Sequence, residues 1–136
     1  MGSGMKSTLF HRWTKKAGIE ETRFEAGEIT VHVVPGIDRL TVAVAGRTTV
    51  DSSPNLRSVL LGLLRSSTTP VVVIDLSALS FLDLSGIATL LEALKAARER
   101  SVKLRLAGMS GQVRALAEIV QLDTIYRNWG SEVEFC

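Results

Sequence analysis

The chain is poor in the residues that build covalent cross-links and metal sites. Its 136 residues include one cysteine, the terminal Cys136, and two histidines, His11 and His32. A single cysteine excludes an intrachain disulfide, and two histidines without neighbouring ligands do not make a familiar zinc site. We therefore expect no metal centre. The absence of a disulfide also fits a reducing compartment.

Strong charge and long apolar runs are also lacking. The formal net charge is +2, and residues 28–136 carry equal numbers of basic and acidic side chains. Such a balance gives no general attraction to nucleic acid. No run approaches the ~20 apolar residues of a membrane span, and the N-terminus lacks the apolar core of a signal peptide. The composition predicts a cytoplasmic protein without a nucleic-acid partner or membrane insertion.

Enzyme motifs are missing as well. The sequence contains no G-x-x-x-x-G-K-[ST] or G-x-G-x-x-G loop that would hold a nucleotide phosphate, and no H-E-x-x-H metal motif. The lone cysteine at the chain end has no obvious base beside it to activate it. We expect neither a cofactor nor an enzymatic activity.

The chain divides into two parts at about residue 28. Residues 1–27 have mixed polarity and no clear period, so we interpret them as a leader and N-terminal extension, flexible or with one short helix. Alternating apolar residues over 29–33 and 40–44 flank the turn sequence Pro35–Asp38 and predict an antiparallel hairpin. Residues 28–136 are expected to form a single domain.

The rest of the chain alternates between helical and strand patterns. Ser52-Ser53-Pro54 is typical of a helix start, with a hydroxyl cap and a proline in the first turn. Strands are expected at 71–74 and 104–107, and further helices after Asp83 and Ser110. A short turn near 122–126 and a last strand at 133–135 complete the pattern. This order predicts an α/β fold: a mixed sheet with an N-terminal hairpin, then alternating βα units, with helices packed against the sheet.

One segment carries a family resemblance. Residues 71–87, VVVIDLSALSFLDLSGI, resemble the signature of the STAS family: an apolar strand ending in Asp-Leu-Ser, a loop with an aromatic residue, and Asp-Ser-[Ser/Thr/Ala]-Gly opening a helix. Gly46 and the segment 104–108 match the family's element order too. The resemblance spans roughly residues 28–135. It implies a non-catalytic protein–protein interaction module like the bacterial anti-sigma factor antagonists.

The resemblance also implies where a partner binds and how binding is controlled. Antagonists bind an anti-sigma kinase and are switched off by phosphorylation of the serine after the aspartate. Here that position is Leu84, which cannot carry a phosphate, and Ser85 is the remaining candidate phosphoacceptor. Asp83 is expected to cap its helix. The expected partner-binding residues lie in two loops and are Asp83, Leu84, Ser85, Gly86, Ile87, Thr48 and Thr49.

Three roles remain open for such a module. The first is an anti-sigma factor antagonist that binds an anti-sigma factor or kinase in partner-switching regulation of transcription. The second is an accessory subunit of a membrane transporter of the lipid-trafficking, ATP-driven type, whose partner would be the transporter ATPase. The third is a scaffold protein of a large stress-sensing assembly.

Overall fold

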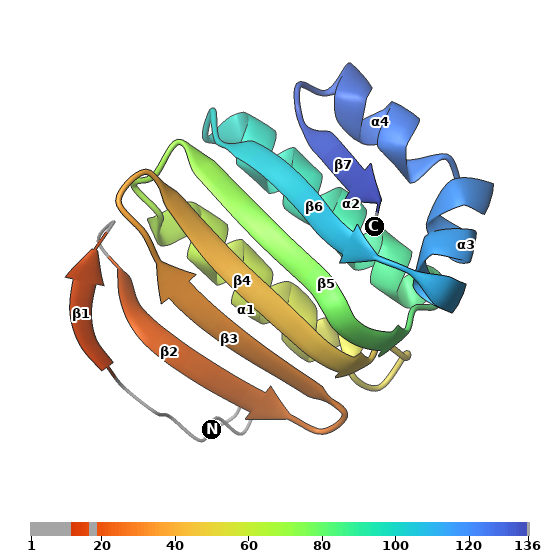
Figure 1. Ribbon diagram of the computed structural model, residues 1–136, viewed down its shortest axis with the longest axis horizontal. Coiled ribbons are helices and arrows are strands. Elements are labelled where there is room, and N and C mark those ends of the chain that lie inside the picture. The colour runs from red at the N-terminus through yellow and green to blue at the C-terminus, as the bar shows by residue number, and fades with distance from the viewer. Residues whose placement is uncertain (1–11, 17–18, 136) are drawn as a thin grey trace.

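The computed structural model describes residues 12–16 and 19–135 as one mixed β-sheet with helices packed against it (Figure 1). The described strands are β1 (Arg12–Lys16), β2 (Ile19–Ala26), β3 (Ile29–Pro35), β4 (Arg39–Arg47), β5 (Val71–Phe81), β6 (Lys103–Met109) and β7 (Glu132–Phe135). The described helices are α1 (Ser53–Ser66), α2 (Leu84–Glu99), α3 (Gly111–Ile119) and α4 (Leu122–Asn128). The strands lie side by side in chain order.

The pairing directions place the loops that follow β4 and β5 at the same end of the sheet. β3 and β4 are antiparallel and joined by a tight turn in which the Gly36 N–H donates to Arg39 O at 2.8 Å. β4, β5, β6 and β7 then run parallel to one another. Parallel neighbours end at the same sheet edge, which is the lower edge for β4 and β5 in Figure 1. The predicted hairpin followed by βα units is confirmed.

The core lies between the sheet and the two long helices. In Figure 1, α1 and α2 lie behind the sheet, and α3 and α4 lie towards its β7 edge. Alternate residues of the central strands, such as Leu40, Val42 and Val44, are fully buried. Helix α1 buries one apolar face, formed by Leu56, Val59, Leu60, Leu63 and Leu64. Burying each such side chain contributes roughly 1.5–3 kcal/mol, so the sheet end rests on a rigid base.

The interpretation of residues 1–27 as flexible or briefly helical is wrong for residues 19–26, which form strand β2. This strand pairs antiparallel with β3, from Thr22 opposite Val33 to Ala26 opposite Ile29. Phe24 packs against the core, while its neighbours are polar. Of residues 20–25 only Phe24 is apolar, so the polar and charged side chains hide the two-residue period. The interpretation is also wrong for residues 12–16, which form strand β1 and pair antiparallel with β2, while residues 1–11 and 17–18 lie outside the described residues.

Strand β5 is longer than the predicted 71–74. The pairing between β4 and β5 shifts register after Ala43, and the carboxylate of Asp75 accepts a hydrogen bond from the Ser77 N–H at 3.0 Å. This irregular step lets the strand continue to Phe81, which lies opposite Arg47. The extra length brings the end of β5 beside the end of β4. The short turn predicted near residue 122 is the helix α4.

Candidate docking site at the start of helix α2

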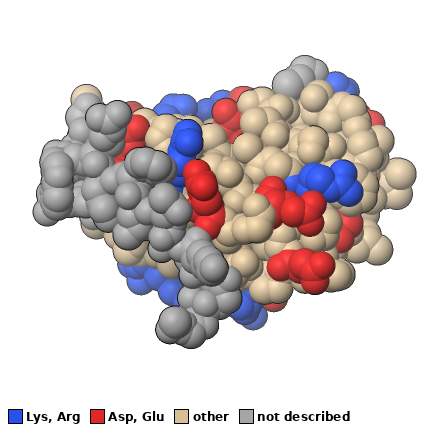
Figure 2. All heavy atoms as spheres, turned by 90° about the horizontal axis from the view of Figure 1, so that it is seen from below, with Lys and Arg blue, Asp and Glu red and all other residues tan. Residues whose placement is uncertain are grey.

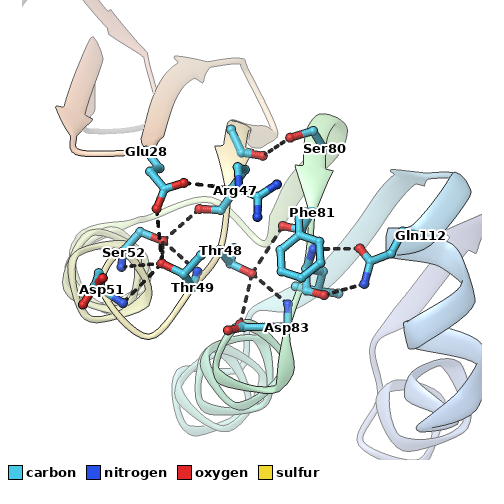
Figure 3. A network of polar contacts seen from close by, with 12 residues as sticks. Glu28, Arg47, Thr48, Thr49, Asp51, Ser52, Ser80, Phe81, Asp83 and Gln112 are labelled. Carbon is cyan, nitrogen blue, oxygen red and sulfur yellow. Dashed lines mark hydrogen bonds and ion pairs between the residues drawn. The ribbon is translucent and has the colours of Figure 1, made fainter.

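Two loops meet where β4 and β5 end (Figure 3). One joins β4 to α1 and the other joins β5 to α2. The Thr48 N–H donates to Phe81 O at 2.9 Å, which ties the loops together directly. Gly46 allows β4 to enter its loop here: its φ is +107°, and an added Cβ would lie 1.8 Å from the Glu28 carbonyl oxygen. Only glycine fits such a close approach of two backbones.

Asp83 caps helix α2, as predicted. Its Oδ1 accepts hydrogen bonds from the Gly86 N–H at 2.9 Å and from the Ser85 hydroxyl at 2.6 Å. The Asp83 N–H donates to Thr48 Oγ1 at 3.2 Å, and the Thr48 hydroxyl lies 3.4 Å from Asp83 Oδ1. One aspartate therefore satisfies a free amide of the helix and joins both loops. A helix cap of this kind contributes about 1 kcal/mol.

The pKa of Asp83 lies below its ordinary value of 3.8. Desolvation is the largest single influence and raises this pKa, but the hydrogen bonds from Ser85, Gly86 and Thr48 together lower it by more than desolvation raises it. The positive end of the α2 dipole acts in the same direction. Asp83 is therefore ionised at neutral pH, and the start of α2 already holds a negative charge.

Three of the predicted contact residues are buried. Thr48 is 0% exposed, Ile87 is 5% exposed and Gly86 is also buried. An added Cβ at Gly86 would lie 2.3 Å from Thr48 Oγ1 and 2.6 Å from Leu82 Cδ1, so glycine is a packing requirement there. As placed in the structure, these residues set the shape of the two loops and present little surface to a partner.

Thr49 and Ser52 build the β4–α1 loop from within. The Thr49 hydroxyl donates to Glu28 Oε2 at 3.4 Å and accepts from the Asp51 N–H at 3.2 Å. Ser52 precedes α1 as predicted, but its hydroxyl does not cap the helix. It donates to Arg47 O at 2.8 Å and accepts from the Thr49 N–H at 2.9 Å, because the loop folds back within its reach.

The exposed surface of this end is apolar and aromatic. Leu84, the first residue of α2, is 68% exposed, and Val50 in the neighbouring loop is 73% exposed. The guanidinium of Arg47 lies 4.6 Å from the centre of the Phe81 ring, and its Nε is 3.2 Å from Glu28 Oε1. Figure 2 views the molecule from this edge and shows a broad uncharged area beside a few charged groups. Exposed apolar side chains with arginine and aromatic rings are typical of binding surfaces.

Sequence reasoning missed Val50, Arg47 and Gln112. Val50 looks like an ordinary loop residue until the fold brings it to the same end as Leu84. Gln112, in the first turn of α3, pairs with the backbone of Leu82 in two hydrogen bonds. Its partner lies far away in the sequence and is a backbone group, so no residue pattern marks the pair.

Within the described residues, no three His, Cys, Asp or Glu side chains gather as a group that could hold a metal ion. No helix in this part of the chain is long and apolar enough to cross a membrane. What the geometry offers is a platform in which partly buried hydrogen bonds fix two loops and the loops present apolar side chains.

Comparisons with known proteins agree with this description. The STAS domain family matches residues 28–134. The anti-sigma-B factor antagonist of Staphylococcus aureus (strain NCTC 8325 / PS 47) is 32% identical over 94 residues, which cover 68% of this chain and 86% of the relative. The antagonist of Staphylococcus epidermidis is 29% identical over 107 residues, covering 78% and 98%.

Among solved structures, an anti-sigma factor antagonist from Mycobacterium paratuberculosis superposes with a TM-score of 0.66. The sequence identity is 22%, and the match covers 75% of this chain and 86% of that one. At this identity the likeness concerns the fold. The family match over most of the chain and the Staphylococcus relatives show that this chain belongs to the STAS domain family and is similar to its anti-sigma factor antagonists.

Proposed function

We propose that the protein is a cytoplasmic anti-sigma factor antagonist that binds an anti-sigma factor or anti-sigma kinase through the end of the sheet where β4 and β5 meet. The exposure of Leu84 carries the proposal. Leu84 is 68% exposed and Val50, in the loop that meets it, is 73% exposed, so two apolar side chains are presented at the same end of the sheet, and exposed apolar surface gathered in one place marks an interaction site. The antagonist relatives support this choice of partner.

The contact surface, in this proposal, is formed by Leu84, Val50, Arg47 and Phe81. The bonded loops hold these side chains in place before a partner arrives, so binding costs little ordering entropy. Aromatic, arginine and apolar residues at the centre of a contact usually provide most of its affinity. The buried Thr48, Gly86 and Ile87 contribute indirectly, by keeping the two loops together.

We also infer that Ser85 is an unfavourable phosphoacceptor, so that phosphorylation at this residue does not control binding. The Ser85 hydroxyl donates to Asp83 Oδ1 at 2.6 Å. A phosphate on this oxygen would remove the donor and place close to two negative charges beside an ionised carboxylate. Since Leu84 cannot be phosphorylated, the binding form would be permanent unless another site controls it.

A charge at Leu84 tests the contact surface. Leu84→Asp should lower affinity for the anti-sigma partner at least a hundredfold, because it buries a new charge in an apolar contact. The matched control is Ile37→Asp, which changes an equally apolar side chain, 91% exposed, in the β3–β4 turn at the other end of the sheet. Calorimetric titration with the purified partner measures both.

Affinity capture from the native cytosol, followed by mass spectrometry, identifies the partner. Recovery of an anti-sigma factor or kinase with the native chain and with Ile37→Asp, and its loss with Leu84→Asp, would support the proposal. Recovery of a transporter ATPase or of a large stress-sensing assembly in its place would refute the role as an antagonist. Equal affinity of Leu84→Asp and the native chain would refute the placement of the surface.

A further inference from the structure

The segment that joins β5 to α2 is held on one side by the β4 loop. The Thr48 N–H donates to Phe81 O, and the Asp83 N–H donates to Thr48 Oγ1. On the other side, β6 pairs with β5 as far as Asp75 opposite Ala107, although β5 itself continues to Phe81. The end of β5 therefore runs past the strand that flanks it.

Gln112 occupies that second side. Its Oε1 accepts from the Leu82 N–H at 2.9 Å, and its Nε2 donates to Leu82 O at 2.7 Å. Figure 3 shows Gln112 across the segment from Thr48, facing the backbone end of β5. A carboxamide offers one acceptor and one donor side by side, which is the pair that a neighbouring strand would present. The side chain thus replaces a strand partner at one residue.

We propose that Gln112 is a positioning residue for docking: it fixes the backbone of Leu82 and thereby sets the direction in which Leu84 leaves the sheet. The Leu82 side chain is already anchored in the core, at 1% exposure. With the backbone held as well, little freedom remains in the residues before the α2 cap. The inference rests on the proposed function, because docking is what the fixed loop serves.

The test separates the position of the loop from the binding of a partner. In ¹⁵N-labelled protein, Gln112→Leu keeps a side chain of similar size and removes both hydrogen bonds. Exchange of the Leu82 amide should become at least tenfold faster, while the Gly36 amide in the β3–β4 turn should not change. Ser110→Ala is the control at the same helix start, since the Ser110 hydroxyl makes no capping bond to α3.

Gln112→Glu adds a readout that a purely structural role would not give. At pH 7 the carboxylate accepts from the Leu82 N–H but has no proton for Leu82 O. Near pH 4 the protonated carboxyl group supplies both a donor and an acceptor. At pH 7 the second carboxylate oxygen and Leu82 O are two acceptors that repel each other and separate the pair, so protection of the Leu82 amide relative to the native chain should be lower at pH 7 and recover towards pH 4.

Faster Leu82 exchange in Gln112→Leu, together with about tenfold weaker binding of the anti-sigma partner, would support the inference. Unchanged Leu82 exchange in Gln112→Leu, or no recovery of Gln112→Glu on acidification, would overturn it. Faster exchange with unchanged partner affinity would overturn the positioning role in docking. If Leu84→Asp also binds the partner normally, the proposed docking surface is wrong as well. The Leu84→Asp result therefore tests the docking surface separately from the role of Gln112.

Discussion

The packing around Gly86 predicts that replacing this glycine by alanine destabilises the protein, whereas the same replacement in a helix usually stabilises it. Replacing a glycine in an exposed helix by alanine stabilises a protein by up to about 1 kcal/mol, because alanine is the better helix former. At Gly86 the added Cβ would lie 2.3 Å from Thr48 Oγ1, 2.6 Å from Leu82 Cδ1 and 2.9 Å from Thr48 Cβ. Ordinary contacts are near 3.5–4 Å, so Thr48 or Leu82 must move.

The cost follows from what those two residues do. Crowding a packed interior typically costs 1–3 kcal/mol. Moving Thr48 also weakens its hydrogen bonds with Asp83, which contribute about 1 kcal/mol each. Against a gain of at most about 1 kcal/mol from helix propensity, Gly86→Ala should destabilise the fold by roughly 1–3 kcal/mol.

Gly62 provides the matched control. It lies on the exposed side of α1, and an added Cβ would meet nothing within 4 Å. Gly62→Ala should therefore stabilise by roughly 0.5–1 kcal/mol. Urea denaturation of both variants measures the two free energies of unfolding. A Gly86→Ala protein as stable as Gly62→Ala would refute the packing argument. An undiminished cost of Gly86→Ala in a Thr48→Ala background, where the contact with Thr48 Oγ1 is removed, would refute it too.

Two further predictions concern single groups. Asp83→Ala should lower the free energy of unfolding by about 1 kcal/mol at pH 7. Because the pKa of Asp83 is lowered in the folded state, its contribution to stability is present above the unfolded-state pKa and disappears as the pH falls through the folded-state value below 3.8. Curves of stability against pH that stay parallel for the native and variant chains down to pH 2 would contradict this. Tyr126 is the only tyrosine of the chain, and burial raises its pKa well above 10, so tyrosinate absorbance near 295 nm should be absent at pH 10 while the protein is folded. Tyr126→Phe should cost roughly 1–2 kcal/mol, because Leu90 O loses a buried donor at 2.5 Å, and a neutral effect in denaturation would argue against that bond.

Much of the fold follows from apolar periodicity. The central strands and the buried face of α1 are visible in the sequence because burial on one side imposes a spacing of two or of three and four residues. Strand β2 is not visible, since only Phe24 is apolar among residues 20–25 and the strand pairs with its neighbours through its backbone. The length of β5 is hidden for a related reason: after Asp75 the strand continues through an irregular step that no residue pattern announces.

The candidate site likewise has features that the sequence predicts and features that depend on the whole fold. Asp83 could be predicted as a cap because capping is local, between residues three apart. The burial of Thr48 and the exposure of Val50 depend on which loops meet, which is a property of the whole sheet. Gln112 acts on a backbone group, and backbone groups are the same for every residue type. Sequence therefore predicts where the site is better than which side chains a partner would reach.

The central claim is that a protein partner docks where β4 and β5 end. The most direct test is to titrate the ¹⁵N-labelled chain with the unlabelled anti-sigma partner and follow every backbone amide. We expect shifts and broadening to concentrate at residues 47–51 and 82–86 and to leave the β3–β4 turn near Ile37 unchanged. Perturbations that spare residues 82–86 and gather elsewhere on the surface would contradict the claim.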